Sequence, residues 1–315
     1  MDKTAFRFIL LVHFVFWFLW LAAGEVGADQ KDTRGVRPSV LAGTWYPGSA
    51  DELTKKIEGF LSRAKPPPIH GKLRALIVPH AGYMYSGQVA AHAYKLLKGE
   101  HFRRIVLVGP SHRVSFDGVS VNLQSGYKTP LGVVPTDQEI AHKLLGAGSH
   151  FRSLGIAHAQ EHCLEIQLPF LQTVLGNFRI VPMLMGRQDY QSCSKLSDTL
   201  VRILGDSEDT LILASTDLSH FHSYSQARAL DLQFIKHVEG FDPRELAEDL
   251  SLGNCEACGG GAVVTALLTA QQWGADRAVI LNYANSGDVT GEHRRVVGYL
   301  SAALIRSSDK DPHPK

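Results

Sequence analysis

The chain has 315 residues, of which 44% are hydrophobic, and its formal net charge is +1 at pH 7. This length supplies enough apolar surface to bury the core of one large domain or of two small ones. A net charge near zero, without a long run of lysine and arginine, argues against nucleic acid as a general partner.

The first 28 residues have the pattern of an export signal. Lys3 and Arg7 precede an apolar run over residues 8–23, and small and polar residues follow that run. This order is typical of a secretory signal, and the run is close to the ~17 residues that the shortest membrane-spanning helices need. We therefore predict a signal peptide or an N-terminal membrane anchor at residues 1–28, with residues 8–23 as the membrane tether in the second case. Either alternative predicts an exported, extracytoplasmic or periplasmic, domain.

The rest of the chain is predicted to be a linker at residues 29–36, one domain at residues 37–306 and a disordered tail at residues 307–315. An amphipathic helix over residues 50–63 comes first, and the "KPPP" sequence ends it because proline lacks an amide hydrogen. The strands that follow are predicted at residues 73–79, 103–110, 178–186, 209–215, 277–287 and 296–305. The helices between them are predicted at residues 86–99, 136–148, 160–176, 189–205, 224–240, 242–253 and 258–274.

Three local features refine this order. Alternating residues over 118–135 predict a hairpin that turns at Ser125-Gly126. Thr136 and Glu139 fit a capping box at the start of the next helix, and Pro169 is expected to kink or restart the helix over 160–176. Apolar strands separated by helices indicate an α/β fold with a mostly parallel central sheet and helices on both faces.

The ends of the predicted strands carry candidate site residues. His80 and His112 follow the first two strands, and Asp217 and His220 follow the strand at residues 209–215. Ligands of open α/β sheets bind beyond the carboxyl ends of the strands. Imidazoles and a carboxylate or thiolate around an open position suit a divalent transition metal. The pattern also allows a polar cleft rim of hydrogen-bonded histidines.

Cys258 is a further candidate ligand. It precedes three glycines and an apolar helix, so the amides at the helix N-terminus are expected to stabilise its thiolate. In an oxidising compartment Cys255 could instead form a disulfide with Cys258 and remove that role. Glu161 and Glu165 are four residues apart and are predicted to share a helix face. They would form a second metal site, an acid–base pair or a solvated surface.

Several motifs, in chain order, resemble those of the Memo family, whose bacterial and archaeal members are called AmmeMemoRadiSam system protein B. They are "AGTWYP", "PHAGYMYSG", "GPSH", "EHCLEIQLPF", "STDLSHF", the Cys-Gly of "ACGGG" and "LNYANSGD", within about residues 38–305. The resemblance implies a fold similar to the class III extradiol dioxygenases of the LigB type. It also implies that His80, His112 and Cys258 bind redox-active iron or copper, with Asp217 and His220 in the same pocket. The dioxygenases use two histidines and a glutamate, so the cysteine departs from their pattern.

Three hypotheses follow. The first is a redox or oxygenase-like protein that holds Fe(II) or Cu, in which His220 acts as the acid–base group and Asp217 orients it or a bound water. The second is a non-catalytic module that binds a peptide or protein in the same cleft. The third is hydrolysis by Cys258 with His220 or His80. The residues expected to bind a small-molecule or peptide ligand are Trp45, Tyr46, Tyr83, Tyr85, Glu161 and His162.

Overall fold

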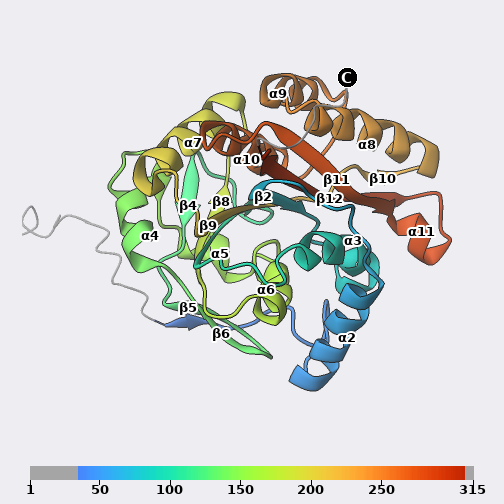
Figure 1. The fold of residues 1–315 in the computed structure, drawn as a ribbon, viewed down its shortest axis with the longest axis horizontal. Coiled ribbons are helices and arrows are strands. Elements are labelled where there is room, and N and C mark those ends of the chain that lie inside the picture. Colours follow the sequence, from blue (N-terminus) through green and yellow to red (C-terminus); the bar gives the residue numbers. More distant parts are fainter. Residues whose placement is uncertain (1–34, 309–315) are drawn as a thin grey trace, which may run out of the picture. The chain divides into compact units, whose positions relative to one another are not determined.

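Four parallel strands form the centre of the main sheet in the computed structural model, which describes residues 35–308 (Figure 1). In spatial order they are β2 (Lys72–Val78), β9 (Thr210–Ser215), β3 (Arg104–Pro110) and β8 (Arg179–Met185). Nearly every residue of these strands is buried, as expected for a parallel sheet that is covered on both faces. The predicted α/β fold class is confirmed.

The outer strands of the sheet are mostly antiparallel, which the sequence did not indicate. On one side, β12 (Val296–Arg306) pairs with β2, β11 (Arg277–Asn285) and β10 (His220–His222). On the other side, β4 (Val119–Val121) pairs antiparallel with β8 and parallel with β7 (Phe151–Arg152). Only the short α11 (Ser286–Thr290) lies between β11 and β12, and a short connection joins antiparallel strands, whereas parallel strands need a longer crossover.

Helices cover the two faces of the sheet and enclose two apolar cores. Side chains alternate along β2, so Leu76 packs in one core and Ile77 in the other. The first core contains residues of α2 (Ala50–Arg63), α3 (Tyr83–Lys95), α5 (Gly155–Ala159) and α6 (Leu168–Val174). The second contains residues of α4 (Gln138–Leu145), α7 (Tyr190–Leu204), α8 (Tyr224–Glu239), α9 (Pro243–Leu252) and α10 (Gly260–Gln272).

The predicted hairpin is present, but its turn is in a different place. Its strands are β5 (Gly126–Thr129) and β6 (Gly132–Pro135), which join β1 (Val36–Arg37) in a separate three-stranded sheet. The prediction of a turn at Ser125-Gly126 is wrong because Gly126 pairs with Val36 and Pro135 inside this sheet.

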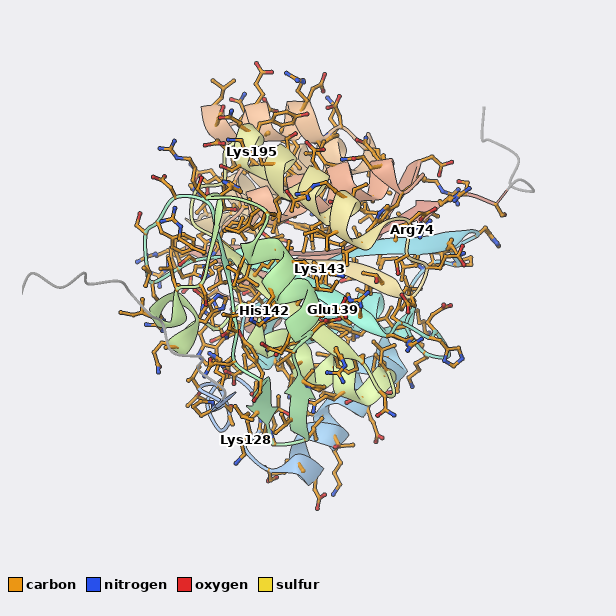
Figure 2. The ribbon with its side chains drawn as sticks, turned by 90° about the vertical axis from the view of Figure 1, so that its left-hand side faces the viewer. Arg74, Lys128, Glu139, His142, Lys143 and Lys195 are labelled. Atoms are coloured by element: carbon orange, nitrogen blue, oxygen red, sulfur yellow. The ribbon has the colours of Figure 1, made fainter. Side chains whose placement is uncertain are left out.

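The helix after the hairpin begins at a different cap from the predicted one. Asp137, not Thr136, is the N-cap of α4, and its carboxylate accepts a hydrogen bond from the backbone N–H of Ile140. The hydroxyl of Thr136 donates to the carbonyl of Gln124 instead. Figure 2 looks onto the outer surface of this helix, where Glu139, His142 and Lys143 are labelled.

No continuous helix spans residues 160–176. Residues 160–164 are not helical, a short 3-10 turn η1 (Glu165–Gln167) follows, and α6 then begins with Pro169 in its first turn. The prediction that Glu161 and Glu165 share a helix face is therefore wrong. The Glu161 carboxylate accepts the backbone N–H groups of His162 and Cys163, and such local bonds compete with helix formation.

The predicted signal or anchor at residues 1–28 lies outside the described residues and stays a prediction, as does most of the linker and tail. Val36 is described and belongs to β1. The backbone N–H of Ser307 donates to Asp276. Within residues 35–308, no helix combines the length and the apolar character that a membrane span needs.

Candidate functional site

Three potential metal ligands from distant parts of the chain meet at the carboxyl ends of the central strands. His80 lies two residues after β2, His112 lies two residues after β3, and Cys258 lies two residues before α10. One ligand atom of each residue lies within 4.8 Å of those of the other two. Ligand atoms around a tetrahedral ion are about 3.5 Å apart, given bonds of ~2.0–2.3 Å. Two imidazoles and a sulfur are ligand types that suit a transition metal, and the limit of 4.8 Å leaves their ligand atoms close enough to share one ion after a small adjustment.

His80 is buried and has a contact at each ring nitrogen. Its Nδ1 lies 3.0 Å from the Ser215 hydroxyl, and its Nε2 lies 3.1 Å from the Cys258 sulfur. Burial, followed by the neighbouring imidazoles of His162 and His112, lowers the pKa of His80 well below its ordinary value. The ring is therefore neutral, which is the form that binds metals.

Glu161 orients the His112 imidazole and lies against that of His162. Its carboxylate accepts a hydrogen bond from Nδ1 of His112 at 2.9 Å and lies 3.0 Å from Nδ1 of His162. Burial alone would raise the pKa of Glu161, but its contacts with these two histidines hold the pKa well below its usual range. Since an ionised carboxylate only accepts, the His112 ring carries hydrogen on Nδ1. A neutral His112 then presents an unprotonated Nε2, as in carboxylate–histidine–metal arrangements.

His162 and Trp45 lie against the ligand group. The ring centroid of His162 is 4.4 Å from that of His112 and 5.2 Å from that of His80. The Trp45 ring lies 4.7 Å from His162 and is 37% exposed. Trp45 thus places a partly exposed aromatic ring against His162.

Cys258 is held through the backbone of Asp217. The N–H of Asp217 donates to the Cys258 sulfur at 3.3 Å, and the N–H of Cys258 donates to the Asp217 carbonyl at 3.2 Å. Burial, followed by the Asp217 carboxylate, raises the pKa of Cys258. The predicted stabilisation of a thiolate by the helix amides is outweighed, because the backbone N–H of Gly259 lowers the pKa of Cys258 less than burial and Asp217 raise it. A bound cation would lower the pKa of Cys258, since a thiol that coordinates a metal is deprotonated.

The alternative of a Cys255–Cys258 disulfide is not seen in the structure. Both residues are free thiols. Cys255 is 1% exposed, and the Cys258 sulfur makes its closest polar contact with His80. The cysteine that the metal hypothesis requires is therefore available.

No hydrogen bond or ion pair joins Asp217 to His220 within residues 35–308. Asp217 is buried and accepts the backbone N–H of His80 at 2.7 Å, and burial raises the pKa of Asp217 to about 6. His220 is oriented instead by the carbonyl of Leu218, which lies 2.7 Å from its Nδ1. A carbonyl only accepts, so Nδ1 carries the hydrogen and a neutral His220 has a free Nε2.

An open cavity of about 820 Å³ adjoins one side of this group. His220 and Cys258 line it, together with Tyr190 and Arg244 from α7 and α9, but His80 and His112 do not. Space for a ligand therefore lies next to the sulfur and the His220 imidazole.

Two of the predicted recognition aromatics are core residues. Tyr46 and Tyr83 are each 3% exposed. Their hydroxyls donate to the Glu165 carboxylate and to the carbonyl of Ile166 respectively. They offer no binding surface, whereas Trp45 and Tyr85 are each 37% exposed.

Glu165 supports the segment that carries Trp45. It is fully buried, forms an ion pair with Arg37, and accepts the backbone N–H groups of Val40 and Leu41. The chain before Trp45 is thereby fixed to η1. Glu165 is thus a structural residue and not part of an acid–base pair.

Comparisons with known proteins agree with these motifs. A family model described as "Memo-like protein" matches residues 37–303. Relatives named "MEMO1 family protein" include one from Methanopyrus kandleri, 34% identical over 86% of this chain and 99% of its own length. Another, from Ignicoccus hospitalis, is 37% identical over 84% of this chain and 97% of its own. Among solved structures, an uncharacterized protein from Escherichia coli K12 has a TM-score of 0.48 at 13% identity, covering 74% of this chain and all of that one.

Proposed function

The chain belongs to the Memo-like family, and from this premise we propose that it binds Fe(II) or Cu through His80, His112 and Cys258. The observation that carries the proposal is that their ligand atoms lie within 4.8 Å of one another. A thiolate and two imidazoles favour iron or copper over magnesium or calcium, which prefer oxygen ligands. We propose a redox or oxygenase-like activity for this site.

When bound, an iron or copper ion supplies one-electron or dioxygen chemistry. The protein's own contribution would be to position the ligands and to move protons. Glu161 would hold His112 with its Nε2 toward the ion. His220, which borders the open cavity and is oriented by Leu218, would give or take a proton at Nε2. A small molecule or peptide would bind in the adjoining cavity.

Metal analysis of protein purified without a His-tag tests the assignment. We expect stoichiometric iron or copper in the wild type and a large loss in Cys258→Ala and in His80→Ala. Cys255→Ala and His237→Ala are matched controls, because neither residue belongs to the ligand group, and both should keep wild-type metal content. Unchanged stoichiometry in both ligand variants would refute the proposal.

A second candidate function is metal-independent binding of a peptide or protein in the same region. The exposed rings of Trp45 and Tyr85 favour it, because aromatic side chains dominate many recognition surfaces. A peptide library screened against chelator-treated protein tests this alternative. Peptides that bind without metal and lose binding in Trp45→Ala would support it, whereas absence of binding to the metal-free protein would reject it.

A further inference from the structure

The His80 ring is connected to a chain of buried polar side chains that reaches away from the ligand group. Nδ1 of His80 contacts the Ser215 hydroxyl at 3.0 Å. The Gln167 amide nitrogen donates to that hydroxyl at 2.8 Å, and the Tyr94 hydroxyl donates to the Gln167 oxygen at 2.6 Å. Ser215 and Tyr94 are 0% exposed and Gln167 is 1% exposed. The three residues come from β9, α3 and η1, so tertiary packing alone brings them together.

The positions of the hydrogen atoms in this series of side chains follow from its contacts with backbone carbonyls, which can only accept hydrogen bonds. The Gln167 amide nitrogen also lies 3.1 Å from the carbonyl of Pro79. A carbonyl only accepts, so this end of the amide is the NH₂ group. The oxygen end then faces Tyr94, whose hydroxyl donates to it.

The single hydrogen of the Ser215 hydroxyl is also accounted for. It points to the carbonyl of Cys163 at 2.7 Å, which can only accept. Ser215 therefore accepts from Gln167 and must accept from His80 as well. Only a hydrogen on Nδ1 of His80 satisfies this contact, and a neutral ring then has its lone pair on Nε2, facing Cys258 at 3.1 Å.

We propose that Ser215, Gln167 and Tyr94 are positioning residues that hold His80 in the Nδ1–H tautomer, so that Nε2 is available as a metal ligand. As a statement about metal binding this inference rests on the proposed function, while the tautomer itself is a property of the protein alone. The charged carboxylate of Glu161 sets the tautomer of His112. The neutral side chains of Ser215, Gln167 and Tyr94 set the tautomer of His80. The two ligand histidines are thus oriented by different side chains, and the backbone of Cys163 contacts both of them, through its N–H to Glu161 and its carbonyl to Ser215.

Two measurements test the inference. Histidine ¹⁵N chemical shifts of the metal-free protein distinguish Nδ1–H from Nε2–H, and we expect Nδ1–H for His80 in the wild type. Anaerobic titration of Fe(II) and of Cu(I) against a competing chelator gives the metal affinity. Ser215→Ala removes the acceptor for Nδ1–H, so we expect a mixture of tautomers and a metal affinity about 10–100-fold weaker, as for other residues that orient metal ligands.

Ser197→Ala is the matched control. Ser197 is also fully buried and accepts from a glutamine amide, that of Gln272, but it does not contact a histidine. It should leave both readouts unchanged. Tyr94→Phe removes only the hydroxyl at the far end of the hydrogen-bonded series. Its His80 ¹⁵N shifts and its metal affinity should lie between those of the wild type and those of Ser215→Ala. This variant provides the test if Ser215→Ala does not fold.

Three results separate the possibilities. A wild-type His80 with Nε2–H, or variants of Ser215 and Tyr94 with unchanged shifts and affinity, would overturn the inference. A wild type with Nδ1–H that takes up neither iron nor copper would refute the proposed function, while the assignment of the tautomer would stand. Nδ1–H in the wild type with weakened affinity in the variants would support both.

Discussion

Replacing Glu161 with glutamine is the sharpest test of how the site is organised. Four hydrogen-bond donors converge on this carboxylate. Oε1 accepts from Nδ1 of His112 and from the backbone N–H groups of His162 and Cys163, and it lies 3.0 Å from Nδ1 of His162. Oε2 accepts from the backbone N–H of His112 at 2.8 Å. Glutamine is nearly isosteric but has only one acceptor atom, so in either orientation its NH₂ group faces a donor.

The size of the effect follows from these contacts. A hydrogen bond to a charged group contributes about 1.5–3 kcal/mol, and the variant loses the charge that strengthens the contacts with both imidazoles. Loss of such a partner of a metal ligand typically weakens metal binding about 10–100-fold, which corresponds to about 1.4–2.8 kcal/mol. The free energy of the lost hydrogen bond and that of the weaker metal binding thus have the same size. We therefore expect Glu161→Gln to weaken binding of Fe(II) or Cu(I) about 10–100-fold.

Competition with a chelator measures this change, and urea denaturation of the same samples shows that the variant is folded. Asp249→Asn is a matched control, because Asp249 contacts Nε2 of His237 at 2.6 Å in a carboxylate–imidazole pair outside the ligand group. It should leave metal affinity unchanged. A folded Glu161→Gln protein that binds metal as tightly as the wild type would refute the orienting role of this carboxylate.

Three further predictions concern stability. Glu165→Ala leaves the Arg37 charge buried without its partner and should cost about 3–5 kcal/mol in urea denaturation; a loss below about 1 kcal/mol would contradict this. Burial lowers the pKa of His158 to about 3. As the pH falls, His158 therefore takes up a proton in the unfolded chain before it does so in the folded protein. The free energy of unfolding should decrease between about pH 6.5 and pH 3, by at most about 5 kcal/mol. His158→Gln should show a flatter pH dependence, and an equal slope would count against the assignment. Saturating Fe(II) at about 100 times its Kd should stabilise the wild type by about 2.7 kcal/mol but not Cys258→Ala, and equal stabilisation of both would argue against the ligand set.

The sequence predicted the parts of the fold that depend on local pattern. The central strands are apolar runs between helices, and this pattern requires a covered parallel sheet. The prediction of a helix over residues 160–176 was wrong. The Glu161 carboxylate binds backbone N–H groups that a helix would need, and hydrophobic periodicity does not reveal such bonds. The antiparallel edge strands depend on pairing between distant segments, which no short window of sequence contains.

The same distinction explains which site residues could be found. His80 and His112 could be predicted because topology places the carboxyl ends of parallel strands along one edge. Cys258 precedes a helix instead, and it was predicted from the glycines that follow it and from the family motif. Glu161 was among the predicted site residues, but its bond to His112, 49 residues away, was not predicted. Ser215, which lies 135 residues from His80, was not predicted at all. A buried serine or glutamine has no sequence signature of its own. Histidine ligands of such a site can therefore be predicted from strand ends. Their tautomers, and with them the ring atoms that can bind a metal, can be assigned only when every buried donor and acceptor has been paired.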